Sequence, residues 1–584
     1  MKPKKTVPSK SPSAASAAAK AGAAEWRWQP WAWAAAAIVV VFWAYGPALN
    51  GAWVFDDTAQ PYAKPGYSPF LSDWLSGVRP ALMFSYWVDK RMAAEGSTYG
   101  FHVSNVLIHL LATCLMFFLV RWFLERSGAE ASRRNLLAGF AAGVFLLHPA
   151  LTEAVAYTAG RSESLSTLWI LAAFAVFLFR PKPGISWGRV VAVLLLFLVA
   201  FKTKEQTVAF PALLLLTDIW WNPGFSFKGI RGNWKLYAAM AAGAALAVVR
   251  EWGQIAHGGG AGFGIDVKWY EYLFTQFRAL LVYIGEFLLP VNLNADWYFP
   301  VSKSIFDHGA IVGLAVLVAM AAAAWHYRRR FPLAAYGFLV YLLLMAPTSS
   351  IIPIKDPVAE RRLYFSIIGL LLILVDLASR LRTDRKTLAT VCAAILVACA
   401  IGTRSRAAVW ADDETFWKDV VQKAPENSRA HFHLGFAWAE QERWFDAIGE
   451  YEQASKLAPA IPDLLLDWGV AYLNTGQPEK ALAKFEQAAK MENGAHAQTQ
   501  IAAAYAQMQR WQDALAALAE AQRVDPGFPF TYVERGKVHL VNGQCAEAVE
   551  DLKTALTLSA PGDPAQDEAK RYLPQAEACA AGAR

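Results

Sequence analysis

Long apolar stretches separated by short charged connections occupy residues 31–402, and a different pattern follows them. The first stretch, WAWAAAAIVVVFWAYGPALN (31–50), has about twenty residues, enough for a helix to cross a bilayer. We predict a helix in this stretch and in eleven others, at 104–123, 135–148, 164–180, 187–201, 206–221, 234–250, 272–290, 308–325, 332–346, 363–379 and 386–402.

Basic residues in the connections predict which side of the membrane each helix end faces, because lysine and arginine favour cytoplasmic loops. Such clusters follow five of the stretches, at 126–134, 180–189, 228–235, 328–330 and 380–386. If the N-terminus is cytoplasmic, these clusters place both ends of the stretch 272–290 on the noncytoplasmic side. Gln276, Arg278 and Glu286 in that stretch are costly in lipid. We therefore predict an interfacial or re-entrant helix there, about eleven crossings in all, a cytoplasmic N-terminus and a noncytoplasmic C-terminus.

After residue 427 the sequence repeats with a period of about 34 residues. Small residues recur at fixed offsets, at Gly435, Gly469, Ala502 and Gly536, and again twelve positions later in each unit. This is the tetratricopeptide (TPR) pattern of paired helices. We predict four repeats over 428–562 and a capping helix over 563–584. Such a solenoid presents a groove that holds a protein or peptide; the alternative is a purely structural spacer.

Composition and charge support two differently solvated parts. The chain of 584 residues is 55% hydrophobic and 18% charged. Residues 428–584 carry 14 Lys and Arg against 21 Asp and Glu, whereas residues 1–427 carry 41 against 27. The predicted organisation is all-α. It comprises a disordered basic segment (1–30), a polytopic membrane domain (31–405), a connecting helix (406–427) and the soluble repeats, whose acidic balance favours partners with basic segments. A Cys545–Cys579 disulfide is compatible with an oxidising compartment.

Two adjacent carboxylates follow the first apolar stretch, in GAWVFDDTAQP at 51–61. Neighbouring side chains of an extended loop point to opposite sides, so Asp56 and Asp57 are expected to have different tasks. One could accept a proton from an acceptor hydroxyl, while the other positions the acceptor or binds a cation. The alternative for Asp57 is a helix cap or Asx-turn.

Cations in the predicted noncytoplasmic loops run against the usual charge distribution, which indicates a bound anion. Arg79 precedes a helix expected to begin at Pro80 and to lie on the membrane surface. Arg161, Lys204 and Arg361 lie in other loops of the same side. Arg161 is equally compatible with an ion pair to Glu153. The same loops hold the supporting candidates His102, His148, Glu153, Glu205, Glu360 and Arg362. Two histidines are too few for a metal site, so packing is the safer interpretation of His102.

The sequence lacks a Gly-rich phosphate loop, an HExxH motif and a Gly-x-Ser-x-Gly motif, which disfavours nucleotide hydrolysis and common hydrolase chemistries. Its motifs, in order, resemble the transmembrane and tetratricopeptide-repeat O-mannosyltransferases and their bacterial relatives, within the GT-C glycosyltransferase superfamily. They are FDD (55–57), RPALMFSYWVD (79–89), FHVSNVLIHLL (101–111), HPALTEAVAYTAGRSE (148–163), KEQ (204–206), AERRLY (359–364) and RAAVWADDETFWKDVVQKAPENSRAHFHLG (406–435).

The resemblance implies an inverting transferase that uses a polyprenyl-phosphate sugar donor and a hydroxyl acceptor on a protein or glycan. In that family an acidic residue of the first external loop serves as the base, which here matches Asp56 or Asp57. Arg79, Arg161, Lys204 and Arg361 would bind the donor phosphate. No cofactor is required, although a divalent cation is compatible with the paired carboxylates, and no nucleic-acid partner is expected.

The bacterial-looking composition places the expected protein in an inner membrane with its repeats in the periplasm. Two other functions remain open from the sequence. One is a membrane-anchored scaffold that recruits an envelope assembly without catalysis, and the other is transport of a lipid-linked sugar.

Overall fold

The computed structural model describes residues 29–64, 66–94, 96–257, 262, 265–560 and 562–582. Within these ranges every regular segment is an α-helix or a 3-10 turn and none is a strand, which confirms the predicted all-α class. Most of the N-terminal segment expected to be disordered, residues 1–28, lies outside the described ranges.

All twelve predicted apolar stretches are helical. They correspond to α2 (Gln29–Tyr45), α5 (Tyr99–Arg126), α6 (Ala131–Leu147), α8 (Arg161–Leu178), α9 (Trp187–Phe201), α10 (Phe210–Trp221), α12 (Trp234–His257), α13 (Trp269–Leu288), α14 (Ala310–His326), α15 (Pro332–Met345), α16 (Leu363–Ser379) and α17 (Arg385–Ala408).

Six helices of the described residues are long and apolar enough to cross a membrane, at 31–48, 99–126, 161–178, 307–326, 360–379 and 385–408. A seventh span results if α6 and the segment Pro149–Ala156 that follows it are counted together. The two are bent by 53° relative to each other. The helix α13, predicted not to cross fully, is not among them. The total of eleven crossings stays a prediction.

The helices pack closely where glycines face each other. A Cβ on Gly337 of α15 would lie 2.4 Å from the carbonyl oxygen of Gly369 in α16, and the reverse contact is equally short. Only glycine therefore allows these two backbones to approach so closely, which is a common device for packing apolar helices in lipid. The buried faces of α5, α6, α8, α15, α16 and α17 share one hydrophobic core.

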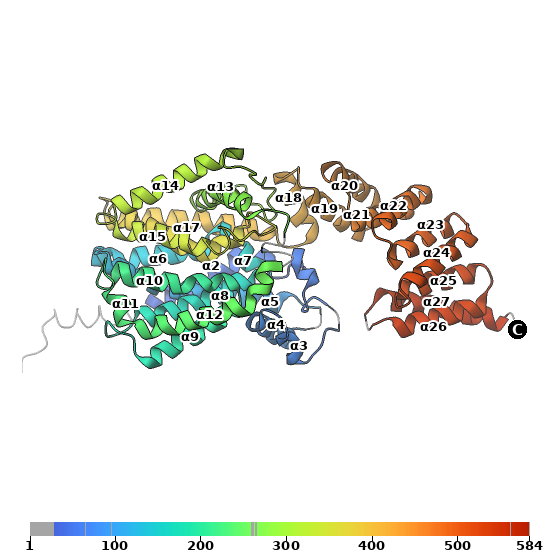
Figure 1. Ribbon diagram of the computed structural model, residues 1–584, viewed down its shortest axis with the longest axis horizontal. Helices are drawn as coiled ribbons and strands as arrows, with labels where there is room; N and C mark the ends of the chain where they lie inside the picture. Colours follow the sequence, from blue (N-terminus) through green and yellow to red (C-terminus); the bar gives the residue numbers. More distant parts are fainter. Residues whose placement is uncertain are drawn as a thin grey trace, which may run out of the picture.

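The two ends of the helix bundle carry different connections. At one end the basic connections bond to each other: Arg133 donates to the carbonyl of Leu381, and Arg180 pairs with Asp218 at 3.1 Å. The opposite end holds α3 (Leu71–Leu75), α4 (Pro80–Met92), α7 (Glu153–Ala156) and several 3-10 turns, and this end faces the repeats (Figure 1). The connections thus separate into the two groups that the charge pattern predicted.

A connecting helix, α18 (Asp413–Lys423), leads into eight helices that alternate as the TPR period predicts: α19 (Ser428–Glu440), α20 (Trp444–Leu457), α21 (Pro462–Asn474), α22 (Pro478–Met491), α23 (Ala495–Gln507), α24 (Trp511–Val524), α25 (Pro529–Val541) and α26 (Cys545–Leu558). The small residues have the expected role. A Cβ on Gly435 would come within 2.6 Å of Tyr451, and one on Gly469 within 2.2 Å of Phe485.

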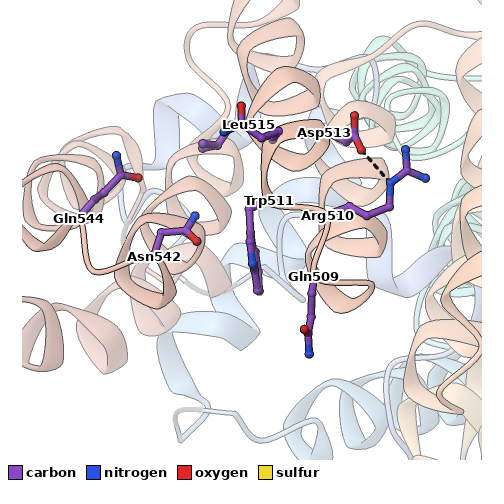
Figure 2. Close-up of a pocket in the computed structure, with 8 residues that line it drawn as sticks. Gln509, Arg510, Trp511, Asp513, Leu515, Asn542 and Gln544 are labelled. Carbon is purple, nitrogen blue, oxygen red and sulfur yellow. Dashed lines mark hydrogen bonds and ion pairs between the residues drawn. The ribbon is translucent and has the colours of Figure 1, made fainter.

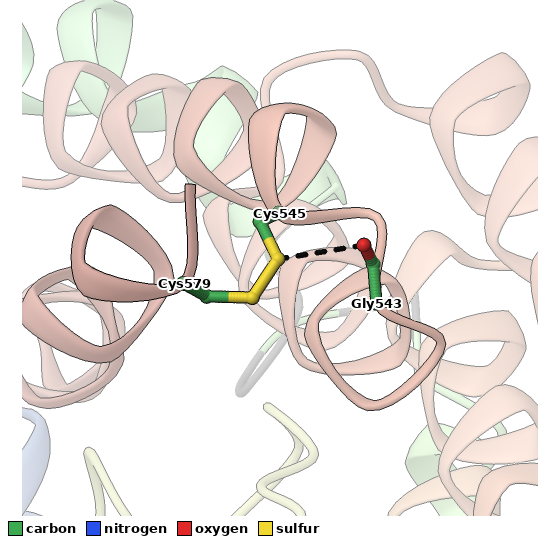
Figure 3. The surroundings of a disulfide bond; sticks show 3 residues. All are labelled: Gly543, Cys545 and Cys579. Atoms are coloured by element: carbon green, nitrogen blue, oxygen red, sulfur yellow. Dashed lines mark hydrogen bonds between the residues drawn. A yellow bond between two sulfur atoms is a disulfide. The ribbon is translucent and has the colours of Figure 1, made fainter. Parts of the chain in front are cut away.

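The predicted capping helix is α27 (Pro564–Gly582), which packs on α26. A disulfide joins Cys545 at the start of α26 to Cys579 in α27, with 5.6 Å between their Cα atoms (Figure 3). The apolar side of α27 buries Ala565, Ala569 and Ala576. The capping helix is therefore held by both packing and a covalent bond.

Candidate functional site

The two adjacent aspartates have opposite environments, as the sequence predicted, although they lie on a 3-10 turn (Phe55–Ala59) rather than an extended loop. The Asp56 side chain is exposed, and its carboxylate has no hydrogen-bond partner among the described residues. Its backbone N–H donates to the Tyr157 hydroxyl at 3.0 Å. Of the two, only Asp56 can meet a substrate.

Asp57 is fully buried. Its Oδ1 accepts hydrogen bonds from the Tyr62 hydroxyl at 2.6 Å and from the N–H of Ala159 at 2.8 Å, whereas its Oδ2 has no partner among the described residues. Burial raises the pKa of Asp57 to about 7, against the opposing effect of the Tyr62 hydrogen bond. Asp57 does not cap a helix. It ties the aspartate turn to the α7–α8 connection instead.

Three of the four predicted phosphate-binding cations lie near one another, and each is paired with a carboxylate. Arg79 binds Glu205 through Nε and Nη2, Lys204 binds Glu163, and Arg361 binds Glu153 through its backbone N–H and Nη1. The side chains of Arg79 and Arg361 are 39% and 22% exposed, so part of each side chain faces solvent. A guanidinium has five N–H donors, and those not used by the carboxylates remain for another anion.

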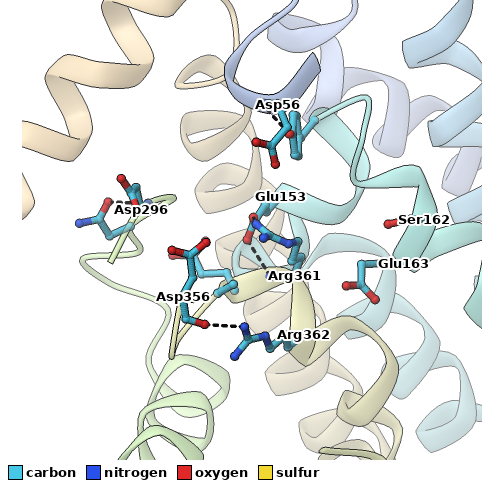
Figure 4. A network of polar contacts seen from close by, with 12 residues as sticks. Asp56, Glu153, Ser162, Glu163, Asp296, Asp356, Arg361 and Arg362 are labelled. Carbon is cyan, nitrogen blue, oxygen red and sulfur yellow. Dashed lines mark hydrogen bonds and ion pairs between the residues drawn. The ribbon is translucent and has the colours of Figure 1, made fainter. Parts of the chain in front are cut away.

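Lys204 is near enough to both arginines for their charges to act on it. Burial lowers its pKa most, and the positive charges of both Arg79 and Arg361 lower it further, although Glu163 opposes them. Figure 4 shows Arg361 paired with Glu153, and it shows Asp56 and Glu163 in the same region. Burial raises the pKa of Tyr157 most; the charges of Asp56 and Glu153 raise it further and that of Arg361 lowers it, so all three charged groups lie near this hydroxyl. We call Arg79, Lys204 and Arg361 the cation row. It brings together residues that are far apart in the sequence at one end of the bundle.

The turn before α8 explains how Glu153 reaches this place. A Cβ at Gly160 would lie 2.4 Å from the carbonyl oxygen of Glu153, so only glycine permits the chain to fold back here. Glu153 is then completely buried beneath the first residues of α8, with Arg361 as its partner. The predicted alternative, an ion pair between Glu153 and Arg161, is wrong.

Arg161 does not belong to the cation row. It is 1% exposed and forms an ion pair with Asp89 at 2.5 Å, and it donates to Asn105 at 2.6 Å and to the carbonyl of Phe101 at 2.8 Å. Its guanidinium carbon also lies 4.5 Å from the centre of the Tyr86 ring. The expectation that Arg161 binds the donor phosphate does not fit this geometry, because its donors are used inside the protein.

Most of the supporting candidates are also structural. Glu205, the partner of Arg79, is the exception, because its side chain is 46% exposed. His102 lies 3.3 Å from the carbonyl of Gly51, and His148 lies 3.0 Å from that of Phe287. Glu360 pairs with Arg406 at 3.3 Å. Arg362 donates to the carbonyls of Pro357 and Asp356, and Figure 4 shows it turned toward Asp356.

A cleft of about 520 Å³ opens beside the aspartate turn. Its lining comes from the segment after the turn, from α3 and α4, and from the α7–α8 and α9–α10 connections; it includes Gln60, Tyr67, Trp74, Arg79, Tyr86 and Glu205. Aromatic rings with a few polar groups are typical of sites that bind small molecules. Arg79, one of the three residues of the cation row, is therefore accessible from this cleft.

The repeat side of the site contributes residues that sequence reasoning missed. Arg429 at the start of α19 binds Asp296 and also lies 3.1 Å from Asp356. His433, one turn later, stacks on Trp417 of α18 with ring centres 4.5 Å apart. Burial lowers the pKa of His433 to about 4; Arg429 contributes, and the charges of Asp296 and Asp56 oppose the shift. In the sequence, Arg429 and His433 were indicated only by the stretch ENSRAHFHLG (426–435), which belongs to the family motif at 406–435.

The repeats hold a second cavity, of about 560 Å³, between α24 and the α25–α26 turn. Figure 2 shows Trp511 in this cavity, with Asn542 and Gln544 on one side and Arg510, paired with Asp513, on the other. No set of three or more His, Cys, Asp or Glu side chains within the described ranges is arranged to hold a metal ion. The compatibility with a divalent cation stays a prediction.

Comparisons with known proteins match these features. No family model matches the chain. It is 24% identical to Protein O-mannosyl-transferase F38B6.6 of Caenorhabditis elegans, covering 71% of this chain and 61% of that protein. It is 24% identical to Protein O-mannosyl-transferase TMTC1 of Homo sapiens, covering 74% and 56%, and 26% identical to human TMTC4, covering 64% and 57%. The chain thus spans little more than half the length of these curated relatives, and the resemblance inferred from its motifs is confirmed.

Solved structures of TPR proteins resemble the chain weakly. The crystal structure of MamA is 22% identical and covers 25% of this chain and 80% of its own, with a TM-score of 0.23. YrrB, described as a TPR protein with an unusual peptide-binding site, is 20% identical and covers 31% and 89%, also with a TM-score of 0.23. Likenesses this weak carry no argument about the present chain, whose repeats are established by their own helices.

Proposed function

We propose that this protein is an inverting glycosyltransferase that moves a sugar from a polyprenyl-phosphate-linked donor to a hydroxyl of a protein or glycan. The observation that carries the proposal is the exposed carboxylate of Asp56, which has no partner among the described residues and lies with Arg361 around the Tyr157 hydroxyl. Relatives named protein O-mannosyl-transferases support the reaction class and a protein acceptor.

In the proposed reaction Asp56 removes the proton of the acceptor hydroxyl as its oxygen attacks the anomeric carbon. The bond between that carbon and the phosphate oxygen breaks, and its electron pair leaves with the phosphate. The free N–H groups of Arg361 and Arg79, with the charge of Lys204, stabilise the negative charge of the departing phosphate. A positioned base contributes about 10²–10⁴-fold to such a step.

The paired carboxylates have a function in this arrangement. Without Glu153, Glu163 and Glu205, three cations would lie together at the end of the bundle and repel each other. With them, the row is close to neutral before the donor arrives. The donor phosphate then competes with the carboxylates for N–H groups, which favours release of the product phosphate after transfer.

We place the site on the noncytoplasmic side of a bacterial inner membrane, with the repeats in the periplasm. The basic connections at the far end of the bundle support this orientation. The Cys545–Cys579 disulfide supports an oxidising compartment for the repeats.

The repeats would recruit the acceptor or a partner protein. Glu440, Asp463 and Asp467 in the first two repeats have no ion-pair partner among the described residues, and Asp467 has a pKa raised to about 7 by burial and by Asp463. Unpaired carboxylates favour a segment that carries lysine or arginine.

The proposal is tested in cells of the source organism by mass spectrometry of periplasmic glycoproteins. Deleting the gene should remove a set of glycopeptides, which the wild-type gene restores and Asp56→Asn does not. Glu130→Gln is the matched control, because Glu130 is 64% exposed in the connection at the opposite end of α5. Unchanged glycopeptides after deletion would favour the scaffold, and donor crossing the membrane without acceptor modification would favour transport.

A further inference from the structure

The first repeat lies directly on the turn that carries Asp56. The ring of Phe55 packs against Phe416 and Trp417 of α18, with ring centres 5.8 and 5.7 Å apart. From α19, the guanidinium carbon of Arg429 lies 5.8 Å from the centre of the same ring. The residue before Asp56 is therefore enclosed by the helices that begin the repeat domain.

Phe55 adopts a backbone conformation that its neighbours must hold. Its φ is +55°, in the left-handed region that residues with a Cβ rarely occupy. Such conformations persist where the surrounding structure determines them, and they cluster at functional sites. The next residue is Asp56, so the backbone of Phe55 sets the direction of the Asp56 carboxylate. Groups that hold the Phe55 ring thereby hold Asp56.

Arg429 is fixed in place by two other loops of the bundle. Its Nε donates to Asp296 at 2.9 Å, its Nη2 contacts the second oxygen of the same carboxylate, and Nη2 lies 3.1 Å from Asp356. Asn427 donates to Asp296 at 3.0 Å. Asp296 is 3% exposed at its side chain, so the pair is inside the contact. One arginine thus joins α19, the segment after α13 and the segment before α16 to the aspartate turn.

We propose that Arg429 is a positioning residue of the transfer reaction, which holds the Asp56 turn in its reactive orientation through the ring of Phe55. This inference rests on the proposed function. It gives the first repeat a role in the active site in addition to recruitment. A displaced base slows the chemical step, and a misplacement of about 1 Å can cost 10²-fold.

The experiment compares arginine variants of the full-length protein in detergent, with a polyprenyl-phosphate sugar and an acceptor peptide from the glycoproteins identified above. Arg443 is the matched control. It lies in the same repeat with 39% side-chain exposure against 35% for Arg429, bonds to two carboxylates, and lies over the Trp438 ring at 4.7 Å. It does not contact Phe55 among the described interactions.

We expect Arg429→Ala to lower kcat at least tenfold while the KM of the donor stays within twofold, and Arg443→Ala to change neither by more than twofold. Arg429→Lys should recover part of kcat, since it keeps a positive charge opposite Asp296. Asp296→Asn should lower kcat as well, and adding it to Arg429→Ala should lower kcat little further, because both act through one contact.

Two results would overturn the inference. The first is an Arg429→Ala protein with the kcat of Arg443→Ala. The second is a loss of kcat that parallels a loss of thermal stability, is not recovered in Arg429→Lys and adds in full to the effect of Asp296→Asn. That result would indicate that Arg429 contributes to stability alone. Failure of the proposed function looks different, because the wild-type protein itself would then transfer no sugar to the acceptor peptide, whatever residue 429 is.

Discussion

The helix bundle and the repeats keep their charged side chains in opposite ways. In the bundle, Arg161 and Asp89 are 1% and 11% exposed at their side chains, and Glu163 is 1% exposed beside Lys204. In the repeats, Arg510 and Asp513 are 51% and 48% exposed, and Arg523 and Glu520 are 69% and 34% exposed. Burying a charge costs several kcal/mol unless it is paired, whereas an exposed pair contributes little. The buried pairs of the bundle therefore hold their charges in single positions, whereas the exposed pairs of the repeats can open to meet a partner.

The largest stability effect is expected from Arg161→Met. This change leaves Asp89 and Asn105 in the interior without their cation, and breaking a buried pair by removing one partner typically costs about 3–5 kcal/mol. Thermal unfolding in detergent measures it. A melting temperature equal to that of the wild type would show that Arg161 is not held as its contacts indicate.

A smaller loss is expected from Cys579→Ser, and it should be confined to the repeats. The disulfide links residues 34 positions apart, and bonds that close loops of this length typically stabilise by about 2–4 kcal/mol. Limited proteolysis at rising temperature should show α26 and α27 cleaved earlier than in the wild type, with the helix bundle unchanged. Equal protection of these helices in both proteins contradicts the expected contribution.

Asp57 is a buried carboxylate without a paired cation among the described residues, and its ionisation should make the stability of the protein depend on pH. Its pKa is raised from 3.8 to about 7 in the folded protein, so between these values the unfolded chain loses a proton that the folded protein keeps. Stability from this group is present below pH 4 and is lost as the pH rises toward 7. Asp57→Asn cannot ionise, so its melting temperature relative to the wild type should increase between pH 4.5 and 7.5. A constant difference over this range rules out the shift.

The smallest effect is expected from Arg523→Ala in the third repeat. Its partner Glu520 is one turn away on the same exposed helix face, and such substitutions usually change stability by no more than about 0.5 kcal/mol. Denaturant unfolding of the full protein, measured beside Arg161→Met, gives the ratio of the two effects. A loss comparable to that of Arg161→Met would remove the contrast between the two halves.

Much of the fold was predictable from the sequence because its signals are local. Every apolar stretch is a helix, since composition and length decide this within one segment. The repeats followed from small residues at fixed offsets, which the contacts of Gly435 and Gly469 explain. Asp56 and Asp57 do differ in burial, but the extended loop from which this was predicted is a 3-10 turn.

The partners of the charged residues were not predictable. Glu153 and Arg161 are eight positions apart and looked like a pair, yet their partners are Arg361 and Asp89, more than seventy residues away in each case. Which cation meets which carboxylate depends on how the helix ends are arranged in space, and a single sequence does not contain that arrangement. The contact of Arg429 with Asp296 and with the Phe55 ring was missed for the same reason.

The central claim is that Asp56 is the base and that Asp57 only anchors its turn. The most direct test measures sugar transfer by purified Asp56→Asn and Asp57→Asn proteins, side by side with the wild type and with a panel of polyprenyl-phosphate sugars. We predict that Asp56→Asn lowers kcat by about 10²–10⁴-fold. Asp57→Asn should stay within about tenfold of the wild type, because asparagine can still accept the Tyr62 and Ala159 hydrogen bonds. Transfer by Asp56→Asn at the wild-type rate, or loss of transfer only in Asp57→Asn, would contradict the claim.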